Sequence, residues 1–132
     1  MATVFVDRMY RETLRLLEDA RDYLLHWEKR DRAGASLGTR LVISRECMLM
    51  TARLTSVMSW VLVQKAVEAG EISDDEAILD ENRLLVREVH VRPLPAGPGP
   101  LSARLWTMLE RSNRLFQRVR RLDDMVTGRR AF

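Results

Sequence analysis

Residues 43–61 read ISRECMLMTARLTSVMSWV, and this stretch decides the fold. Its most apolar positions alternate between spacings of four and three, which places them on one face of an α-helix. They are Ile43, Cys47, Met50, Leu54, Val57 and Val61, widened by Met58 and Leu62. A second apolar row lies about 100–120° around the same helix. It consists of Val42, Leu49, Trp60, Val63 and Val67. A helix with two apolar faces is typical of the centre of a bundle, so we expect it to run from about residue 38 to residue 69 and to end at Gly70.

The same periodicity continues outward into two flanking segments. Residues 3–32 carry apolar residues at helical spacing, end in a basic turn and are followed by Gly34, as a helix end should be. Residues 101–127 keep strict four-three spacing, which is typical of a bundle seam, and Gly128 follows. The sequence therefore predicts an all-α fold, an antiparallel three-helix bundle packed up-down-up as one domain over residues 1–132.

The connector between the second and third helices has a different composition. Ser73 and Glu76 have the spacing of a capping box, which predicts a short helix over about residues 74–85. Residues 86–92 alternate loosely and are expected to be extended, and the four prolines and two glycines of residues 93–100 break regular structure. Residues 71–92 hold seven acids against three arginines, so the connector is acidic.

Composition limits the class of protein. The chain has 132 residues, 46% of them hydrophobic and 31% charged, which is typical of one globular domain. Its single cysteine, Cys47, cannot form an internal disulfide and falls on the main apolar row, so we expect a small core residue in a reducing compartment. The start has no signal-peptide pattern, and the longest uncharged apolar stretch, Leu54–Gln64, is shorter than the about 20 residues that span a bilayer. We expect a cytoplasmic protein that does not contact membranes.

The sequence contains no pattern that predicts catalysis. His26 and His90 lie far apart without metal-ligand spacing, and both are expected at the surface or at an edge. There is no phosphate-binding loop, no H-E-x-x-H motif and no nucleophile elbow. The acids between Asp74 and Glu81 fit helix capping and solvation, or else an acidic docking surface. We therefore predict a non-enzyme with no catalytic residue, no metal and no cofactor.

A row of arginines on the third helix suggests a binding face. Arg104, Arg111 and Arg118 recur every seven residues, and Arg114 and Arg121 lie beside them within an arc of about 100°. Three interpretations remain open: a solvated face that pairs with acids of residues 3–32, an acidic protein surface as partner, or nucleic acid, for which interleaved aromatic residues are missing.

Trp106 points away from the seam of the third helix. It is interpreted either as an exposed anchor for a partner or as packing against the proline-rich loop. The predicted partner-binding residues are Trp106, Arg111, Arg114, Arg118 and Arg121. A continuous second apolar row needs a cover, which is either a bundle neighbour or a partner subunit. Three helices offer few neighbours, so we predict a homodimer interface at Val42, Leu49, Trp60, Val63 and Val67.

Two segments resemble the RcdA family, which is named for regulation of CtrA degradation in alphaproteobacteria. In the central helix the resemblance rests on Thr51, Arg53-Leu54, Ser59-Trp60, Gln64, Ala66-Val67 and Gly70-Glu71. In the third helix it rests on residues 112–115, Arg118-Val119 and residues 121–123. The resemblance implies a dimeric three-helix bundle without catalysis or cofactor, a cytoplasmic adaptor that helps the ClpXP protease capture cell-cycle regulators, with other adaptors as partners. Known members carry a longer flexible tail than the residues that follow Gly128 here.

Two alternative functions remain open beside the adaptor. One is a nucleic-acid-associated regulator that uses the arginines of the third helix. The other is a purely structural oligomerisation module.

Overall fold

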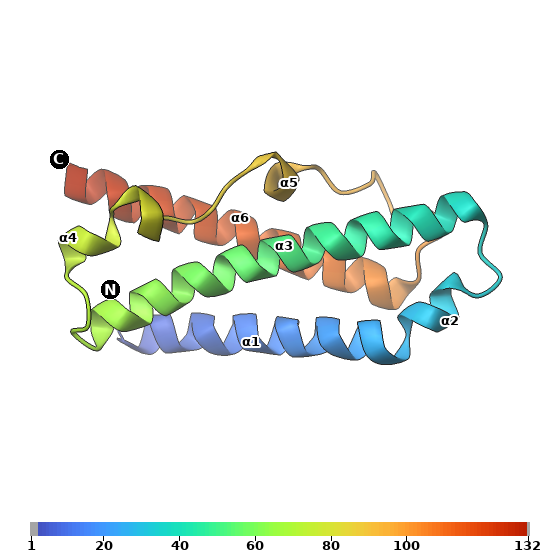
Figure 1. Ribbon diagram of the computed structural model, residues 1–132, viewed down its shortest axis with the longest axis horizontal. Coiled ribbons are helices and arrows are strands. Elements are labelled where there is room, and N and C mark those ends of the chain that lie inside the picture. Colours follow the sequence, from blue (N-terminus) through green and yellow to red (C-terminus); the bar gives the residue numbers. More distant parts are fainter. Residues whose placement is uncertain (1–2, 132) are drawn as a thin grey trace.

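Three long helices form the body of the protein (Figure 1). The computed structural model describes residues 3–131 of the chain and the side chains of residues 4–128. The long helices are α1 (Thr3–His26), α3 (Leu37–Glu68) and α6 (Ala103–Ala131). The short elements are α2 (Glu28–Arg32), α4 (Asp74–Ala77), the 3-10 helix η1 (Asp80–Asn82) and α5 (Glu88–Val91). No strand occurs between residues 3 and 131, so the predicted all-α helical bundle is confirmed.

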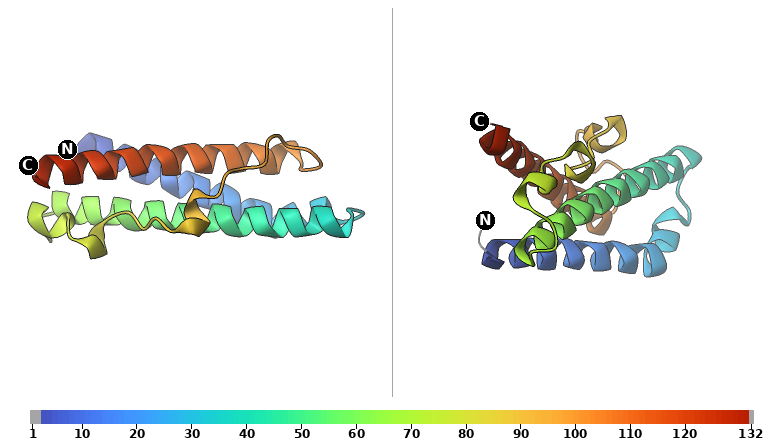
Figure 2. Two further views of the ribbon diagram at one scale, coloured as in Figure 1. Left: turned by 90° about the horizontal axis from the view of Figure 1, so that it is seen from above. Right: turned by 60° about the vertical axis from the view of Figure 1, so that its left-hand side comes forward.

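The direction of the third long helix differs from the prediction. Trp60 donates a hydrogen bond to Asp123, which joins the C-terminal parts of α3 and α6, so these helices run parallel. Arg111, in the first half of α6, pairs with Asp19, in the second half of α1, so these two run antiparallel. Figures 1 and 2 show the same order, with α1 opposite in direction to both other helices. The bundle is therefore up-down-down, and the predicted up-down-up order is wrong.

The long connector explains this topology. An up-down-up bundle needs only a short loop between its second and third helices, whereas 34 residues separate α3 from α6 here. Figure 1 shows these residues returning along the bundle past α4 and α5 to the end where α6 begins. α6 is about 44 Å long at 1.5 Å per residue, a span that 34 partly extended residues cover easily.

Local signals fix most helix ends. The Ser36 hydroxyl accepts the backbone N–H of Thr39 at the start of α3, and Gly70 follows its end with a φ of +74°. The capping box of Ser73 and Glu76 is present. The helix that begins there is shorter than predicted, because Leu79 adopts an extended conformation and η1 follows.

Two further expectations about local structure need correction. The predicted helix over residues 3–32 is interrupted at Trp27, so that α2 is a separate short helix. Residues 86–92, expected to be extended, contain α5. The resulting turn at Trp27 is closed by side chains, since Asp31 accepts hydrogen bonds from the hydroxyls of Tyr23 and Ser102.

The core lies between the three long helices and contains the whole main apolar row of α3. Ile43, Cys47, Met50, Leu54, Val57 and Val61 are all buried. By length and composition alone, α3 is apolar enough to cross a membrane. However, 56% of its most apolar window is buried inside the bundle, as is usual for the central helix of a globular fold.

Candidate functional site

The structure divides the predicted arginine row of α6 into two groups. Arg111 forms an ion pair with Asp19 at 3.2 Å, and Arg118 forms one with Glu12. The Arg104 guanidinium lies 3.7 Å from the centre of the Trp27 ring, a cation–π contact. These arginines therefore join α6 to α1 and α2, as expected of a solvated face that pairs with the acids of the first helix.

The remaining two arginines of the row face solvent. Arg114 and Arg121 are exposed, and neither forms an ion pair with any side chain that the structure describes. Trp106 is half-buried and packs against the core, so it is not the exposed anchor that was one of its two interpretations. Of the five predicted partner-binding residues, only Arg114 and Arg121 are free to contact a partner without breaking an existing contact.

The predicted dimer row of α3 is largely covered within the chain. Leu49 and Trp60 are 2% and 3% exposed, whereas Val42, Val63 and Val67 are half-buried. The connector, which returns along the bundle, and α6, which runs parallel to α3, cover this row. The prediction of a dimer had assumed that three helices leave it uncovered. Leu49 and Trp60 are thus core residues and are not available to a partner subunit.

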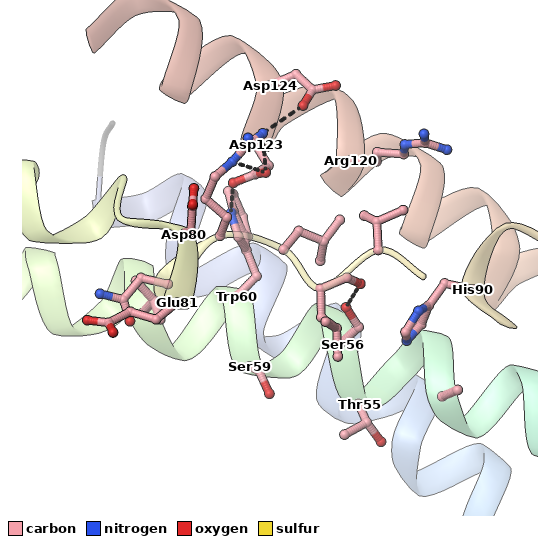
Figure 3. A pocket seen from close by; sticks show the side chains of 17 residues that line it. Thr55, Ser56, Ser59, Trp60, Asp80, Glu81, His90, Arg120, Asp123 and Asp124 are labelled. Carbon is pink, nitrogen blue, oxygen red and sulfur yellow. Dashed lines mark hydrogen bonds and ion pairs between the residues drawn. The ribbon is translucent and has the colours of Figure 1, made fainter. Parts of the chain in front are cut away.

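A cleft of about 910 Å³ lies where the connector crosses between α3 and α6 (Figure 3). Its floor contains Trp60 and Ser56, and its rim includes Asp80, Glu81 and Arg120. The remaining lining residues are Ala52, Thr55, Ser59, Val63, Asn82, Arg83, Leu84, Leu85, Val86, His90, Asp123 and Asp124. Several polar groups of this cleft already form hydrogen bonds within the fold, and these bonds limit which of them can contact a ligand or partner.

Asp123 is the buried centre of one such network. Its carboxylate accepts the indole N–H of Trp60 at 2.9 Å and the Nε and Nη2 of Arg83 at 3.2 and 3.1 Å. Arg83 also pairs with the exposed Asp124 at 3.0 Å (Figure 3). A buried carboxylate needs such partners, because an unpaired charge in the interior is costly. The network therefore fastens the connector to both α3 and α6.

A second network fastens the connector farther along α3. Arg53 is fully buried, and its Nε and Nη2 donate to the carbonyl oxygens of His90 at 3.0 Å and Arg92 at 2.7 Å. The Ser56 hydroxyl donates to the carbonyl oxygen of Leu85 at 2.6 Å. Burial lowers the pKa of Arg53, and the carboxylate of Glu46 opposes that shift.

Sequence reasoning missed these buried charges. Glu46 and Arg53 are completely buried, and Glu46 is paired with Arg45 at 3.0 Å. Both stand between the two apolar rows of α3 and are seven residues apart. Their position could have predicted their burial, because a charged side chain flanked by apolar rows on both sides of a helix does not reach solvent.

His90, which lines the cleft, is held in place by its neighbours. It was expected at the surface or at an edge, but it is buried and stacks on Phe116, and its Nδ1 accepts the backbone N–H of Arg87. Burial lowers its pKa, and the charges of Arg53 and Arg87 act in the same direction. The imidazole is therefore neutral near pH 7. His26 is exposed, as expected.

Cys47 is a core residue, as predicted. Burial, reinforced by the charge of Glu28, raises the pKa of its thiol to about 12, which keeps it protonated and unreactive. Among the described side chains, no three His, Cys, Asp or Glu residues gather in a way that could hold a metal ion.

The outer face of α3 differs from the rest of the surface. Leu41, Met48 and Leu62 are 62%, 60% and 50% exposed. Four exposed residues between them are small and uncharged: Ser44, Thr51, Thr55 and Ser59. The exposed Arg45 lies beside this row and is not part of it. Beside Met48, a shallow groove of about 500 Å³ opens between this face and Leu24 of α1. This uncharged outer face of α3 is a helix surface that a second helix can approach closely.

Comparisons with known proteins now assign the fold to a family. A family model described as protein of unknown function (DUF1465) matches residues 1–132. The crystal structure of RcdA from Caulobacter crescentus CB15 matches with a TM-score of 0.71 and 33% sequence identity, covering 92% of this chain and 89% of that one. The chain belongs to the DUF1465 family and to the RcdA family. None of the curated proteins matches it significantly. The resemblance to RcdA found in the sequence is confirmed, and it extends over almost the entire bundle.

Proposed function

We propose that this RcdA-family protein is a non-enzymatic adaptor that binds protein partners and assists ClpXP-dependent degradation of cell-cycle regulators in the cytoplasm. The observation that carries the proposal is the match to RcdA, at 33% identity over 92% of this chain and 89% of RcdA. The aligned part is nearly the whole of both chains, so the comparison extends over the complete bundle.

The chemistry of the cleft supports a binding role over a catalytic one. Its buried polar groups hold the connector in place: Asp123 binds Arg83, and Ser56 binds the backbone at Leu85. The neutral His90 uses its Nδ1 to accept a backbone N–H. These groups are committed to the fold, so they do not form a general acid–base pair.

Partner contact is proposed on α6. The free guanidinium groups of Arg114 and Arg121 are its main contacts, with Arg111, Arg118 and the half-buried Trp106 around them. The test is a pull-down with the protein as bait, in which ClpX and ClpP are quantified by mass spectrometry. We expect the double variant Arg114→Glu and Arg121→Glu to lose most of the captured protease, because a rim charge of the wrong sign repels the partner.

The matched control is the double variant Arg21→Glu and Arg40→Glu. It carries the same change in charge on exposed residues away from the predicted face of α6. Helicity measured by circular dichroism checks that both variants remain folded. Equal capture by the two double variants and the wild type would refute the assignment to α6.

We further propose that the adaptor is a homodimer in which two copies pack through the uncharged outer face of α3. A two-fold interface brings the same patch of each copy together, and small residues between Met48 and Leu62 let two helices approach closely. Sedimentation velocity should show a dimer for the wild type and a monomer for Met48→Glu, because the variant places two carboxylates in the interface. The control Leu79→Glu changes an exposed apolar residue of the connector and should stay dimeric. A monomeric wild type, or a dimeric Met48→Glu, would contradict this proposal.

A further inference from the structure

We propose that the outer surface shared by α1 and α6 docks an acidic, partly apolar segment of a protein partner. This arginine surface consists of Arg8, Arg11 and Arg15 of α1 and Arg114, Arg118 and Arg121 of α6. The inference rests on the proposed adaptor function and deepens it by naming the chemistry of the bound segment.

The register of α1 against α6 brings the two halves of the surface together. The ion pairs of Arg111 with Asp19 and of Arg118 with Glu12 fix an antiparallel register. The same register carries Arg15 toward Arg114, halfway between the two pairs. Arg8 and Arg121 follow at the next turn, where Figure 1 and the right-hand view of Figure 2 show α1 and α6 diverging toward the chain termini.

Apolar side chains lie among the arginines. Phe5 precedes Glu12 by seven residues and Leu122 follows Arg118 by four, so each continues the row that faces the other helix. Both are partly buried and pack against the core. Val4, one turn before Arg8, and Met125, one turn after Arg121, are exposed. The surface therefore offers apolar contacts bordered by guanidinium groups.

Most of the guanidinium groups of this surface form no ion pair with the side chains that the structure describes. Arg8, Arg11 and Arg15 follow one another at spacings of three and four, as do Arg114, Arg118 and Arg121. Like charges at these spacings repel on a helix. Glu12 is the one carboxylate paired with the six, through Arg118; the other five have no ion pair among the described side chains. An arrangement that costs folding stability is explained when a partner supplies the missing negative charge.

The chemistry favours an acidic protein segment as the occupant. Guanidinium groups bind carboxylates through two parallel hydrogen bonds, and the interspersed apolar residues match side chains that nucleic acid does not have. Proteins that bind single strands rely on exposed aromatic residues for stacking. Phe5 is the one aromatic residue of this surface, and it packs against the core.

A binding measurement with the full chain tests the inference. The probe is a fluorescein-labelled synthetic peptide of repeating Glu-Glu-Leu units, and the readout is fluorescence anisotropy. We expect the wild type to bind and the double variant Arg15→Gln and Arg114→Gln to bind at least about tenfold more weakly, with affinity falling as salt is added. The control Arg21→Gln and Arg40→Gln, with the same loss of charge elsewhere, should stay within about twofold of the wild type.

Three results would overturn the inference. One is no binding of the peptide by the wild type, and another is equal affinity for both double variants. The third is tighter binding of a duplex DNA probe that is lost in Arg15→Gln and Arg114→Gln, which would assign the arginine surface to nucleic acid.

This assay contains no protease, so it separates the inference from the adaptor function. If the peptide binds as expected while wild-type bait captures no ClpX, the adaptor function is overturned and the arginine surface stands. If bait captures ClpX and the peptide does not bind, the arginine surface is overturned and the adaptor function stands.

Discussion

The two sides of α6 differ in whether their charged side chains are buried and paired. On the side facing α3 and the connector, Asp123 is buried and fully paired with Trp60 and Arg83. On the outer side, Arg114 and Arg121 are exposed without an ion pair among the described residues. The same helix thus carries charges that hold the fold and charges that the fold does not use. Burial and pairing, more than sign or number of charges, distinguish a structural residue from one available to a partner.

The largest loss of stability is expected on the buried side, for Arg53→Met. The variant leaves the carbonyl oxygens of His90 and Arg92 without donors and removes a cation that interacts with the buried Glu46. Urea unfolding should show a loss of about 3 kcal/mol in unfolding free energy. The exposed Arg40→Met should change it by less than about 0.5 kcal/mol. Equal stability of the two variants would mean that the connector is not held by Arg53.

A smaller loss is expected for Asp123→Ala. Removing this carboxylate leaves the buried Trp60 indole N–H without an acceptor and weakens the hold on Arg83, at a cost of about 2 kcal/mol. Asp124→Ala removes a neighbouring carboxylate that is 66% exposed, and should cost less than about 0.5 kcal/mol. Thermal unfolding of the pair measures the difference. Similar losses for the two variants would show that burial does not make Asp123 more important for stability than Asp124.

A modest pH dependence is expected from His90. Its pKa in the folded chain is lowered, so the unfolded chain takes up the proton more readily as the pH falls. Stability contributed by the neutral imidazole is present above the ordinary histidine pKa of about 6.5 and is lost as the pH falls below it. Between pH 7.5 and 5, the free energy of unfolding should therefore fall more steeply with decreasing pH for the wild type than for His90→Gln. Equal slopes for the wild type and His90→Gln would contradict the role of His90.

The smallest effect on stability is expected for Arg114→Gln, on the outer side. This residue has no ion pair to lose, and like charge is removed from beside Arg118, so the unfolding free energy should shift by less than about 0.5 kcal/mol. A destabilisation above about 1 kcal/mol in urea unfolding would mean that Arg114 supports the fold.

Helical periodicity was sufficient to predict the secondary structure of the body. The four-three spacing of residues 101–127 and the double row of α3 are local patterns, so they identify helices without reference to the rest of the chain. The capping box at Ser73 and the stop at Gly70 are equally local. Cys47 could be placed in the core because its row repeats along the whole helix.

Features that depend on how distant segments meet could not be read from periodicity. The connector returns along the bundle and makes α6 parallel to α3, and this single fact buries Trp60, Leu49 and His90. A helical pattern states which face is apolar, but not which neighbour covers it. The division of the α6 arginines into paired and free groups likewise depends on the register against α1.

The proposed adaptor function, in which the chain delivers other proteins to ClpXP without catalysing a reaction, can be tested with purified proteins. The direct measurement is the rate at which purified ClpXP degrades a cell-cycle regulator from the same cell as this protein is added. We expect the rate to rise with the wild-type protein and not to rise with the double variant Arg114→Glu and Arg121→Glu, although that variant remains folded. A rate that is unchanged by the wild-type protein, or raised equally by both, would contradict it.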